Sequence, residues 1–313
     1  MYLSISKAAE VLRGGGIVAI PTETVYGLAG NAFDETVVAK IFAAKERPFF
    51  DPLIVHIAEF GELESLVAEV PKNAMLLAEK YWPGPLTLVL PKKEKVPDLT
   101  TGGMPTVAVR MPKKQIARDI IKLAGFPLAA PSANMFQHLS PTNAEHVLEQ
   151  LGGRIDGVVD GGACEIGVES TVIGFEGETP VIYRPGAITE EMIGFKTTHH
   201  SPLATSHPSP GLLNKHYCPS TALYLGMPSE VPPNSGLLAF GELPENSIGF
   251  AKILNLSESG DLIEAAANLY GMLHKLDSFG LNKIFAILPP RTGLGNAIND
   301  RLAKASCHLL YFA

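Results

Sequence analysis

The stretch from Ile17 to His56 determines how this chain folds; it reads IVAIPTETVYGLAGNAFDETVVAKIFAAKERPFFDPLIVH. Its first four residues are apolar and end at Pro21, a pattern typical of a short buried strand. Asp34 stands where it would cap a helix with apolar residues at helical spacing, which ends before Pro48. A second apolar run, 53–57, predicts another buried strand with a histidine inside it. This order predicts an open α/β sheet, whose strand ends face a ligand-binding crevice.

Polar side chains flank the elements of this stretch. Thr22 and Thr24 follow the first predicted strand, and Lys45 and Arg47 end the helix. Taken singly, each is more often a turn hydroxyl or a solvated helix end that complements the helix dipole. Together they place hydroxyls and cations where strand ends face a crevice, which favours an anionic ligand.

Composition restricts the class of protein. A chain of 313 residues suggests two domains of roughly 150 residues each. The net charge is −7, and residues 1–194 hold 17 Lys and Arg against 24 Asp and Glu, which argues against a large nucleic-acid-binding surface. No apolar run approaches the ~20 residues of a membrane span, and the N-terminus lacks the pattern of a signal peptide. We therefore expect a cytoplasmic protein.

Cysteine spacing and motif searches exclude several kinds of site. The 3 cysteines form no C-x-x-C pair, so we expect neither a disulfide framework nor a Cys-rich zinc site. Residues 195–220 are rich in His, Ser, Pro and Thr, which indicates a linker, and their histidines match no zinc spacing. We expect no metal site built from protein ligands. The phosphate-loop pattern G-x-x-x-x-G-K-[ST] does not occur anywhere in the chain.

Two later segments of the first domain carry candidate ligand residues. Alternation along 106–111 puts Thr106 and Arg110 on one face of a strand, so Arg110 faces either a ligand or solvent. The strand predicted at 126–130 ends in Pro131-Ser-Ala-Asn134 and is followed by Ser140. A strand end before a helix start suits phosphate or ribose contacts, although turn and cap residues are the commoner explanation.

The same segment predicts a capping box that opens the next helix. Thr142 and Glu145 have the spacing in which a hydroxyl and a carboxylate each bond the other's backbone N–H. We therefore expect Thr142 to cap a helix that runs to Leu151.

A second α/β unit is predicted after the linker. We expect strands at 222–225, 236–240 and 284–288, and helices at 262–276 and 295–305. The glycines around residue 294 do not complete a dinucleotide-binding fingerprint, so they indicate only a turn before a helix.

Taken together, these motifs resemble those of the YrdC-type threonylcarbamoyl-AMP synthases. The resemblance rests on Pro21-Thr-Glu-Thr-Val-Tyr-Gly-Leu28, Lys45-x-Arg47-Pro48, Pro52-Leu-Ile-Val-His56, Pro131-Ser-Ala-Asn134 and Ser170-Thr-Val172. The linker motif Ser209-Pro-Gly…His216-Tyr217 resembles the longer, two-domain branch of that family. The implied fold is a YrdC-like twisted open mixed sheet with helices at 1–195, a linker acting as a lid at 196–220, and a smaller Rossmann-like α/β domain at 221–313.

The resemblance also implies a reaction. L-Threonine and bicarbonate (or carbon dioxide) would form a carbamate, which attacks the α-phosphate of ATP and releases pyrophosphate. The product, threonylcarbamoyl-adenylate, would serve a downstream tRNA threonylcarbamoyl transferase that modifies the adenosine following the anticodon. Such a nucleotidyltransferase implies Mg²⁺ on the ATP phosphates.

Site residues are implied wherever the family's motifs match this sequence. Lys45 and Arg47 would be catalytic. L-Threonine would be bound by Thr24, His56, Arg110, Ala130 and Ser170. ATP would be bound by Lys45, Arg47, Asp51, Thr106, Ser132, Asn134, Ser140, Arg184 and Tyr217.

Two departures and two alternatives accompany this assignment. Asp51 stands where the family usually has asparagine, and Phe136-Gln137 replaces a usual Ser-Gly pair ahead of Ser140. One alternative is an RNA-binding module of YrdC-like fold, against which the acidic first domain argues. The other is a carbamoyl-transfer domain of the hydrogenase-maturation type, which would be accompanied by zinc-finger modules that these cysteines cannot build.

Overall fold

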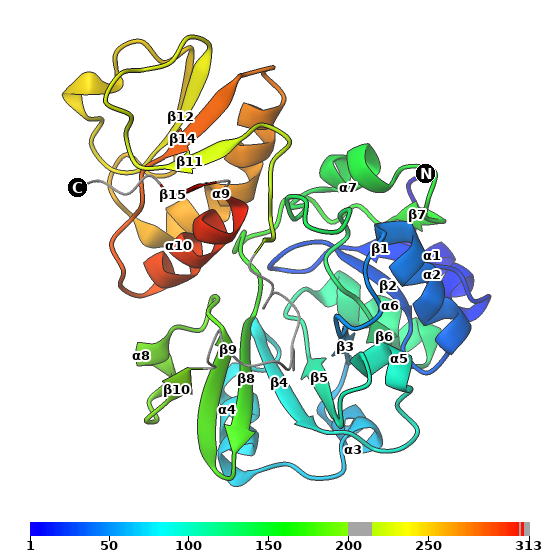
Figure 1. Ribbon diagram of the computed structural model, residues 1–313. Helices are drawn as coiled ribbons and strands as arrows, with labels where there is room; N and C mark the ends of the chain where they lie inside the picture. Colours follow the sequence, from blue (N-terminus) through cyan, green and yellow to red (C-terminus); the bar gives the residue numbers. More distant parts are fainter. Residues whose placement is uncertain (200–214, 307, 310–313) are drawn as a thin grey trace.

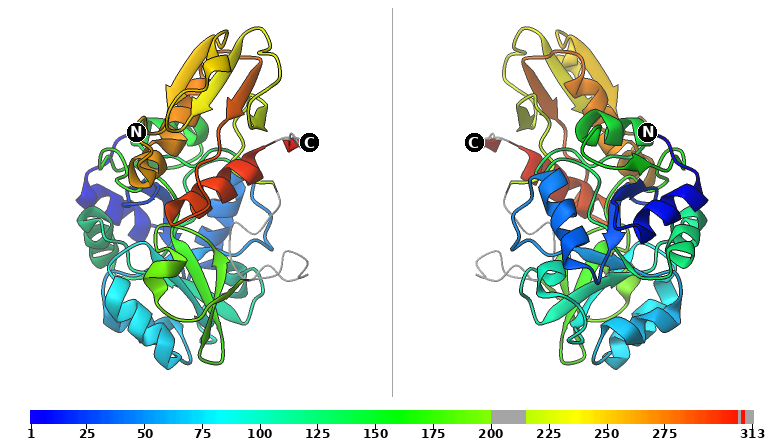
Figure 2. Two further views of the ribbon diagram at one scale, coloured as in Figure 1. Left: turned by 90° about the vertical axis from the view of Figure 1, so that its left-hand side faces the viewer. Right: turned by 90° about the vertical axis from the view of Figure 1, so that its right-hand side faces the viewer.

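The computed structural model describes residues 1–199, 215–306 and 308–309, without the side chains of the last two. A large mixed sheet and a smaller sheet lie in two units, and the smaller unit stacks on one end of the larger (Figures 1 and 2). The predicted fold class, a mixed α/β sheet followed by a smaller α/β unit, is confirmed. The predicted domain boundaries remain predictions, and most of the proposed lid falls outside the described residues.

The described part of the first unit contains a ten-stranded sheet in the order β10-β9-β8-β4-β5-β3-β6-β2-β1-β7. Its strands are β1 Val18–Ile20, β2 Gly27–Asn31, β3 Ile54–His56, β4 Leu86–Pro91, β5 Thr106–Arg110, β6 Leu128–Ala129, β7 Gly157–Val158, β8 Thr171–Glu176, β9 Thr179–Arg184 and β10 Thr198–His199. The helices are α1 Ile5–Arg13, α2 Glu35–Lys45, α3 Leu63–Leu66, α4 Lys72–Tyr81, α5 Asp98–Thr101, α6 Gln115–Ala124, α7 Ala144–Leu151 and α8 Glu190–Ile193, with a 3₁₀ turn η1 at Phe60–Glu62.

The described part of the second unit contains five parallel strands in the order β13-β12-β14-β11-β15. They are β11 Leu223–Leu225, β12 Ser235–Ala239, β13 Lys252–Asn255, β14 Lys283–Ala286 and β15 His308–Leu309. Helices α9 Leu262–Asp277 and α10 Leu294–Ala305 lie between this sheet and the first unit, and a 3₁₀ turn η2 spans Glu245–Ser247 (Figure 1).

The opening stretch folds largely as its sequence predicts. Asp34 caps α2, since its carboxylate accepts hydrogen bonds from the backbone N–H groups of Thr36 and Val37. One element was not predicted: β2 lies between the first strand and α2 and pairs antiparallel with β1. Gly27 and Gly30 lie in β2, and such residues weaken the signal of a strand in a sequence.

The predicted capping box is wrong. The residue that caps α7 is Asn143, whose side-chain oxygen accepts from the N–H of His146 at 2.8 Å. Asparagine is at least as good a cap as threonine, so the helix begins one residue later than expected. The parallel strand β13 was not expected, because two of its four residues are exposed and its apolar pattern is weak.

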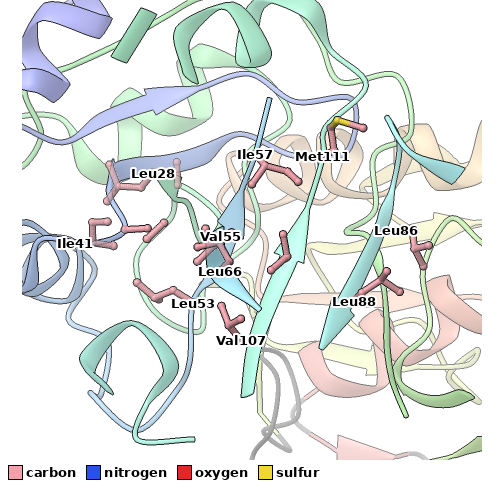
Figure 3. Close-up of a cluster of buried hydrophobic side chains, with 14 of the residues drawn as sticks. Leu28, Ile41, Leu53, Val55, Ile57, Leu66, Leu86, Leu88, Val107 and Met111 are labelled. Atoms are coloured by element: carbon pink, nitrogen blue, oxygen red, sulfur yellow. The ribbon is translucent and has the colours of Figure 1, made fainter. Parts of the chain in front are cut away.

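An apolar core holds the first unit together and fixes the strand ends. Leu28 of β2, Val55 of β3 and Leu88 of β4 are each fully buried in one cluster with residues of α2 (Figure 3). A second cluster joins the two units: Val25 and Leu139 of the first pack with residues of α9 and α10.

No helix in the described ranges has the length and apolar character that a bilayer span requires.

Candidate active site

A cavity opens where several strands of the large sheet end. It is lined by Thr22, Val25, Gly27, Arg47, Ile54, His56, Arg110, Ala130, Pro131, Ser132, Glu169, Ser170, Arg184, His216 and Tyr217. We call Thr22, Val25, His56, Arg110 and Ala130 the sheet wall. We call Glu169, Arg184, His216 and Tyr217 the interface wall, because the second unit packs behind it.

Arg110 is the cation of the sheet wall. It ends β5 directly beside His56 of β3 and is 3% exposed. Its Nη2 donates to Oε1 of Glu23 at 2.6 Å, its Nη1 donates to the hydroxyl of Thr24 at 2.9 Å, and its Nε lies 3.4 Å from the carbonyl of Gly84. Of the two orientations that the sequence left open, the structure has the one facing the cavity.

Thr24 lies behind this arginine, outside the cavity lining. Its hydroxyl accepts from Arg110 and lies 2.9 Å from the hydroxyl of Thr22, which donates to the carbonyl of Val25 at 2.6 Å. Because Thr24 is fully buried, its contribution in this conformation is to orient Arg110.

His56 is a neutral side chain of the sheet wall. Burial, reinforced by the nearby charge of Arg110, lowers the pKa of His56 to about 3. Its Nδ1 lies 3.2 Å from the carbonyl of Ile54, which requires a proton on Nδ1 and leaves Nε2 as an acceptor.

Ala130 of the sheet wall follows β6 and lies close to Gly27 of β2. A Cβ on Gly27 would lie 3.3 Å from the Cβ of Ala130, so glycine allows this close approach.

Arg47 reaches the cavity with a carboxylate already bound. Its Nη2 lies 2.9 Å from Oδ2 of Asp51, and both side chains are 3% exposed. Arg47 also donates to the carbonyls of Asp51 and Pro52. Asp51 therefore serves as the counter-ion of Arg47, which explains how a carboxylate is accommodated at this position.

Lys45 does not line the cavity. Its Nζ donates to the carbonyl oxygens of Ser132 and Asn134, the latter at 2.6 Å, and the residue is 1% exposed. Burial, followed by the charge of Arg47, holds the pKa of Lys45 well below its usual value. In this conformation Lys45 shapes the loop that carries Ser132.

The residues predicted on that loop are divided between cavity and core. Ser132 lines the cavity, whereas Asn134 is buried and donates to the carbonyls of Met135 and His138. Ser140 is fully buried, and its hydroxyl donates to Oε1 of Glu169 at 2.6 Å. Ser140 thus reaches the cavity lining only through Glu169.

Arg184 and Ser170 meet at the edge of the interface wall. Arg184 donates twice to the carbonyl of Ser170, at 3.2 and 3.0 Å, and once to its hydroxyl at 3.1 Å. That hydroxyl also lies 2.7 Å from the hydroxyl of Thr87. Within the described residues Arg184 forms no ion pair with a carboxylate, unlike Arg47 and Arg110.

Tyr217 completes the interface wall from the end of the linker. It is 1% exposed, and its φ of 63° lies in the left-handed region, which a bulky side chain rarely adopts. Its ring packs 4.0 Å from that of His216, and burial raises the pKa of Tyr217 to about 12, so its hydroxyl stays protonated. The surrounding packing therefore holds a strained backbone in place at the cavity.

The predicted site residues that line the cavity are Arg47, His56, Arg110, Ala130, Ser132, Ser170, Arg184 and Tyr217. Five more are bonded to lining residues from behind: Thr24, Lys45, Asp51, Asn134 and Ser140. One predicted residue lies apart from the site. Thr106 lies at the start of β5, four residues from Arg110 and so about 13 Å along the strand. It does not line the cavity. The described residues contain no group of three His, Cys, Asp or Glu side chains that could hold a metal ion.

Four residues of the site were missed by sequence analysis. Glu23 and Glu169 each adjoin a predicted ligand residue, but an acidic residue beside an ATP site gave no reason to assign it. His216 was considered only as a linker histidine. Arg301 lies in a helix more than a hundred residues after Glu169, the carboxylate that it contacts. Only Glu23, inside the Thr-Glu-Thr motif, carried a usable signal.

Comparisons with known proteins agree over nearly the whole chain. A family model described as "Telomere recombination", that of the Sua5, YciO and YrdC proteins, matches residues 10–186. A second, described as "Threonylcarbamoyl-AMP synthase, C-terminal domain", matches residues 187–307. The two matched regions follow one another along the chain in the order that the sequence motifs indicate.

Relatives and solved structures give the same result. A protein of Pyrococcus abyssi named threonylcarbamoyl-AMP synthase is 42% identical over 96% of this chain and 94% of its own. A Bacillus subtilis protein of that name is 40% identical over 96% and 92%. The crystal structure of P. abyssi Sua5 complexed with L-threonine has a TM-score of 0.88 at 40% identity, covering 96% of this chain and 94% of that one. These relatives support neither the RNA-binding nor the carbamoyl-transfer alternative.

Proposed function

The chain belongs to the threonylcarbamoyl-AMP synthase family, and from this premise we propose how its cavity makes that product. The amine of L-threonine adds to carbon dioxide, supplied by bicarbonate, and gives a carbamate. A carbamate oxygen then bonds to the α-phosphorus of ATP, while the bond from that phosphorus to the bridging oxygen breaks. Pyrophosphate leaves with the electron pair, and threonylcarbamoyl-AMP remains.

L-Threonine binds at the sheet wall. Arg110 has five N–H groups, of which Glu23, Thr24 and Gly84 occupy three, so two are left for the substrate carboxylate. The threonine complex of the P. abyssi relative supports an amino-acid substrate of this class.

His56 recognises a donor of the substrate. Because its pKa is about 3, Nε2 stays an acceptor at physiological pH and accepts from the hydroxyl or the ammonium of threonine. Ser170, at the edge of the interface wall, lines the same cavity and supplies a hydroxyl that can also bond the substrate. A site built to hydrogen-bond a substrate hydroxyl discriminates strongly against analogues that lack it.

ATP binds along the interface wall. The observation that carries this proposal is that Arg184 forms no ion pair with a carboxylate in the described structure, while Arg47 and Arg110 do. Arg184 is therefore the guanidinium best able to take up phosphate charge, assisted by Arg47. Both are fixed before the substrate arrives, which is how such transfers are stabilised electrostatically. Ser132 and Tyr217 supply neutral hydroxyls beside the nucleotide.

The residues of this cavity would accept Mg²⁺ as part of the ATP complex. The carboxylates of Glu23, Asp51 and Glu169 are each engaged by an arginine, so they offer no free ligand set. Mg²⁺ commonly keeps several waters and binds through substrate phosphates, a mode that fits this cavity. When bound, the ion would supply charge neutralisation on the phosphates.

The product passes to a downstream enzyme. A mixed anhydride of this kind is an activated acyl donor, which is useful only to an acceptor such as a tRNA threonylcarbamoyl transferase. The lid proposed from the linker would protect it from water, and Tyr217 is the described residue that would close against ATP. These steps would take place in the cytoplasm.

Pyrophosphate release tests the proposal directly. The full chain is assayed with ATP and Mg²⁺, with L-threonine and bicarbonate omitted in turn. We expect release only when both are present, because the attacking carbamate is made from the two. Release from ATP alone at an equal rate would identify a generic ATPase and overturn the proposed reaction.

A further inference from the structure

A buried ion pair links the second unit to the cavity. Arg301 of α10 donates from Nε to Oε2 of Glu169 at 2.7 Å, and the side chains are 1% and 7% exposed. Glu169 lines the cavity and directly precedes Ser170. A charge of the second unit is therefore held against the interface wall, with almost no solvent to screen it.

Tyr270 of α9 makes a second bond to the same carboxylate. Its hydroxyl lies 2.9 and 3.1 Å from the two oxygens of Glu169, and the residue is fully buried. With Ser140 donating to Oε1, the carboxylate has donors from three separate segments. Burial alone would raise the pKa of Glu169, but Arg301 and Arg184, together with these hydrogen bonds, lower it to about 2. Glu169 is thus permanently charged and has little freedom to rotate.

The guanidinium of Arg301 also contacts the loop after β9 and the ring of Tyr217. Its Nη2 donates to the carbonyl of Pro185 at 3.0 Å, next to Arg184. Its central carbon lies 5.1 Å from the centre of the Tyr217 ring, within the range of a cation–π contact. One side chain therefore contacts Glu169 and Tyr217 of the interface wall, together with the loop that follows Arg184.

The backbone around this contact is tightly packed. A Cβ on Gly186 would lie 2.4 Å from the backbone nitrogen of Thr171 and 2.5 Å from the carbonyl oxygen of Glu169. The loop after β9 therefore presses against the segment that begins β8. A displacement of Pro185 would carry over to Ser170 and Arg184, which are hydrogen-bonded to each other.

We propose that Arg301 and Tyr270 are positioning residues for the synthase reaction, through which the second unit sets the geometry of the nucleotide side of the cavity. They line no part of the cavity themselves. They hold Glu169, and through it Ser140, in place, and Arg301 supports Arg184 and Tyr217 from behind. The inference rests on the proposed function, which places ATP along this wall.

This arrangement predicts unequal effects on the two substrates. Arg301 and Tyr270 act on Glu169, and Arg301 also acts on the loop next to Arg184 and on Tyr217, which face the nucleotide. Within the described residues their hydrogen bonds reach neither Arg110 nor His56. Loss of either should raise KM for ATP much more than KM for L-threonine. A defect that only unfolds part of the protein would instead lower kcat and leave both KM values unchanged.

The test uses the full chain in the pyrophosphate assay with each substrate varied. Tyr270→Phe removes one hydroxyl from a charged acceptor, and we expect KM for ATP to rise about tenfold while KM for threonine changes less than about twofold. Arg301→Lys keeps the charge but loses the fork that bonds Glu169 and Pro185 together, so we expect a similar or larger rise. Tyr224→Phe and Arg291→Lys, in the second unit away from the cavity, are the matched controls and should behave as wild type.

The outcomes separate the two proposals. If the wild type does not require threonine and bicarbonate, the proposed function fails. If it does, but Tyr270→Phe and Arg301→Lys keep the wild-type ratio of the two KM values, the positioning role is overturned and these residues only stabilise the interface. Conservative changes are used because removing Arg301 outright would leave the Glu169 carboxylate buried and unpaired, which endangers folding.

Discussion

The two walls of the cavity differ in how their buried charges are paired. In the sheet wall, Arg110 is neutralised by Glu23, which lies in the loop between β1 and β2 of the same sheet. In the interface wall, Glu169 is paired with Arg301 of the second unit, and Arg184 is left without a carboxylate partner among the described residues. The charge pairing of the sheet wall is therefore contained in the first unit, whereas that of the interface wall depends on how the two units dock. We therefore expect the affinity for the amino acid to depend on the first unit alone. The affinity for the nucleotide should depend on the contact between the two units.

The charge pairing of the sheet wall predicts the largest effect. Arg110→Met would leave Glu23, which is 1% exposed, as an uncompensated buried charge. Breaking a buried ion pair in this way costs about 3–5 kcal/mol of folding free energy. Urea unfolding of the variant should show this loss together with failure to bind threonine.

The double variant provides the control. Glu23→Gln in the Arg110→Met background removes the unpaired charge, so most of the stability should return while threonine binding stays lost. If the double variant were as unstable as the single one, Glu23 would not be the group that needs Arg110 for charge compensation. The claim that the sheet wall pairs its own charges would then be wrong.

The unpaired cation of the interface wall predicts the next effect. Arg184→Ala should lower kcat by about 10²–10³, the usual consequence of removing one preorganised group that stabilises developing charge. Rapid-quench measurement of adenylate formation isolates this step. Arg154→Ala, which removes a surface arginine paired with Glu46, is the matched control. Equal rates for Arg184→Ala and wild type would show that phosphate charge is taken up elsewhere.

The contact between units also predicts a smaller effect of pH. His146 of α7 stacks on His274 of α9 with ring centres 3.8 Å apart. His274 bonds the carbonyl of Ser140 and faces Asp277, while His146 faces Thr142 and Asn143. Burial, followed by the charge of His274, lowers the pKa of His146 to about 4. The folded state thus binds fewer protons than the unfolded state between pH 6.5 and 4, so stability falls as pH falls through that window.

Urea midpoints at several pH values measure this dependence. We expect the loss attributable to His146 to be roughly 1–2 kcal/mol once solvent screening is allowed for. His146→Gln should flatten the curve between pH 6.5 and 4, and the same change at the exposed His138 should not. An unchanged slope in His146→Gln would mean that the stacked pair does not govern docking of the units in acid.

Sequence analysis recovered the sheet wall better than the interface wall. His56 and Arg110 stand within strands, where apolar alternation and strand ends place polar residues near a crevice, although for Arg110 the alternation left open whether the side chain faces a ligand or solvent. Their register, with His56 directly beside Arg110, then follows from the parallel pairing of β3 and β5. The local pattern thus predicts where such residues stand in a strand, and the packing of the sheet decides which face meets the cavity.

Local sequence patterns do not contain the information needed to predict the interface wall. Glu169 and Arg301 are 132 positions apart. Asp300 also pairs with Arg301, but an aspartate next to an arginine in sequence does not indicate that the arginine is buried against a distant carboxylate. Lys45 illustrates the same limit, since a lysine at a helix end looks solvated although this one is 1% exposed. Burial of a charge is decided by tertiary packing, so these roles become visible only when the two units are seen together.

Hydrogen exchange with one substrate at a time tests the central claim, that each wall binds its own substrate. L-Threonine alone should protect amides of the sheet wall, at 22–26, 54–56 and 108–110. ATP alone should protect those of the interface wall, at 184–186 and 215–219. Protection of 184–186 and 215–219 by threonine alone, with no further change on adding ATP, would contradict the division of the cavity into two walls.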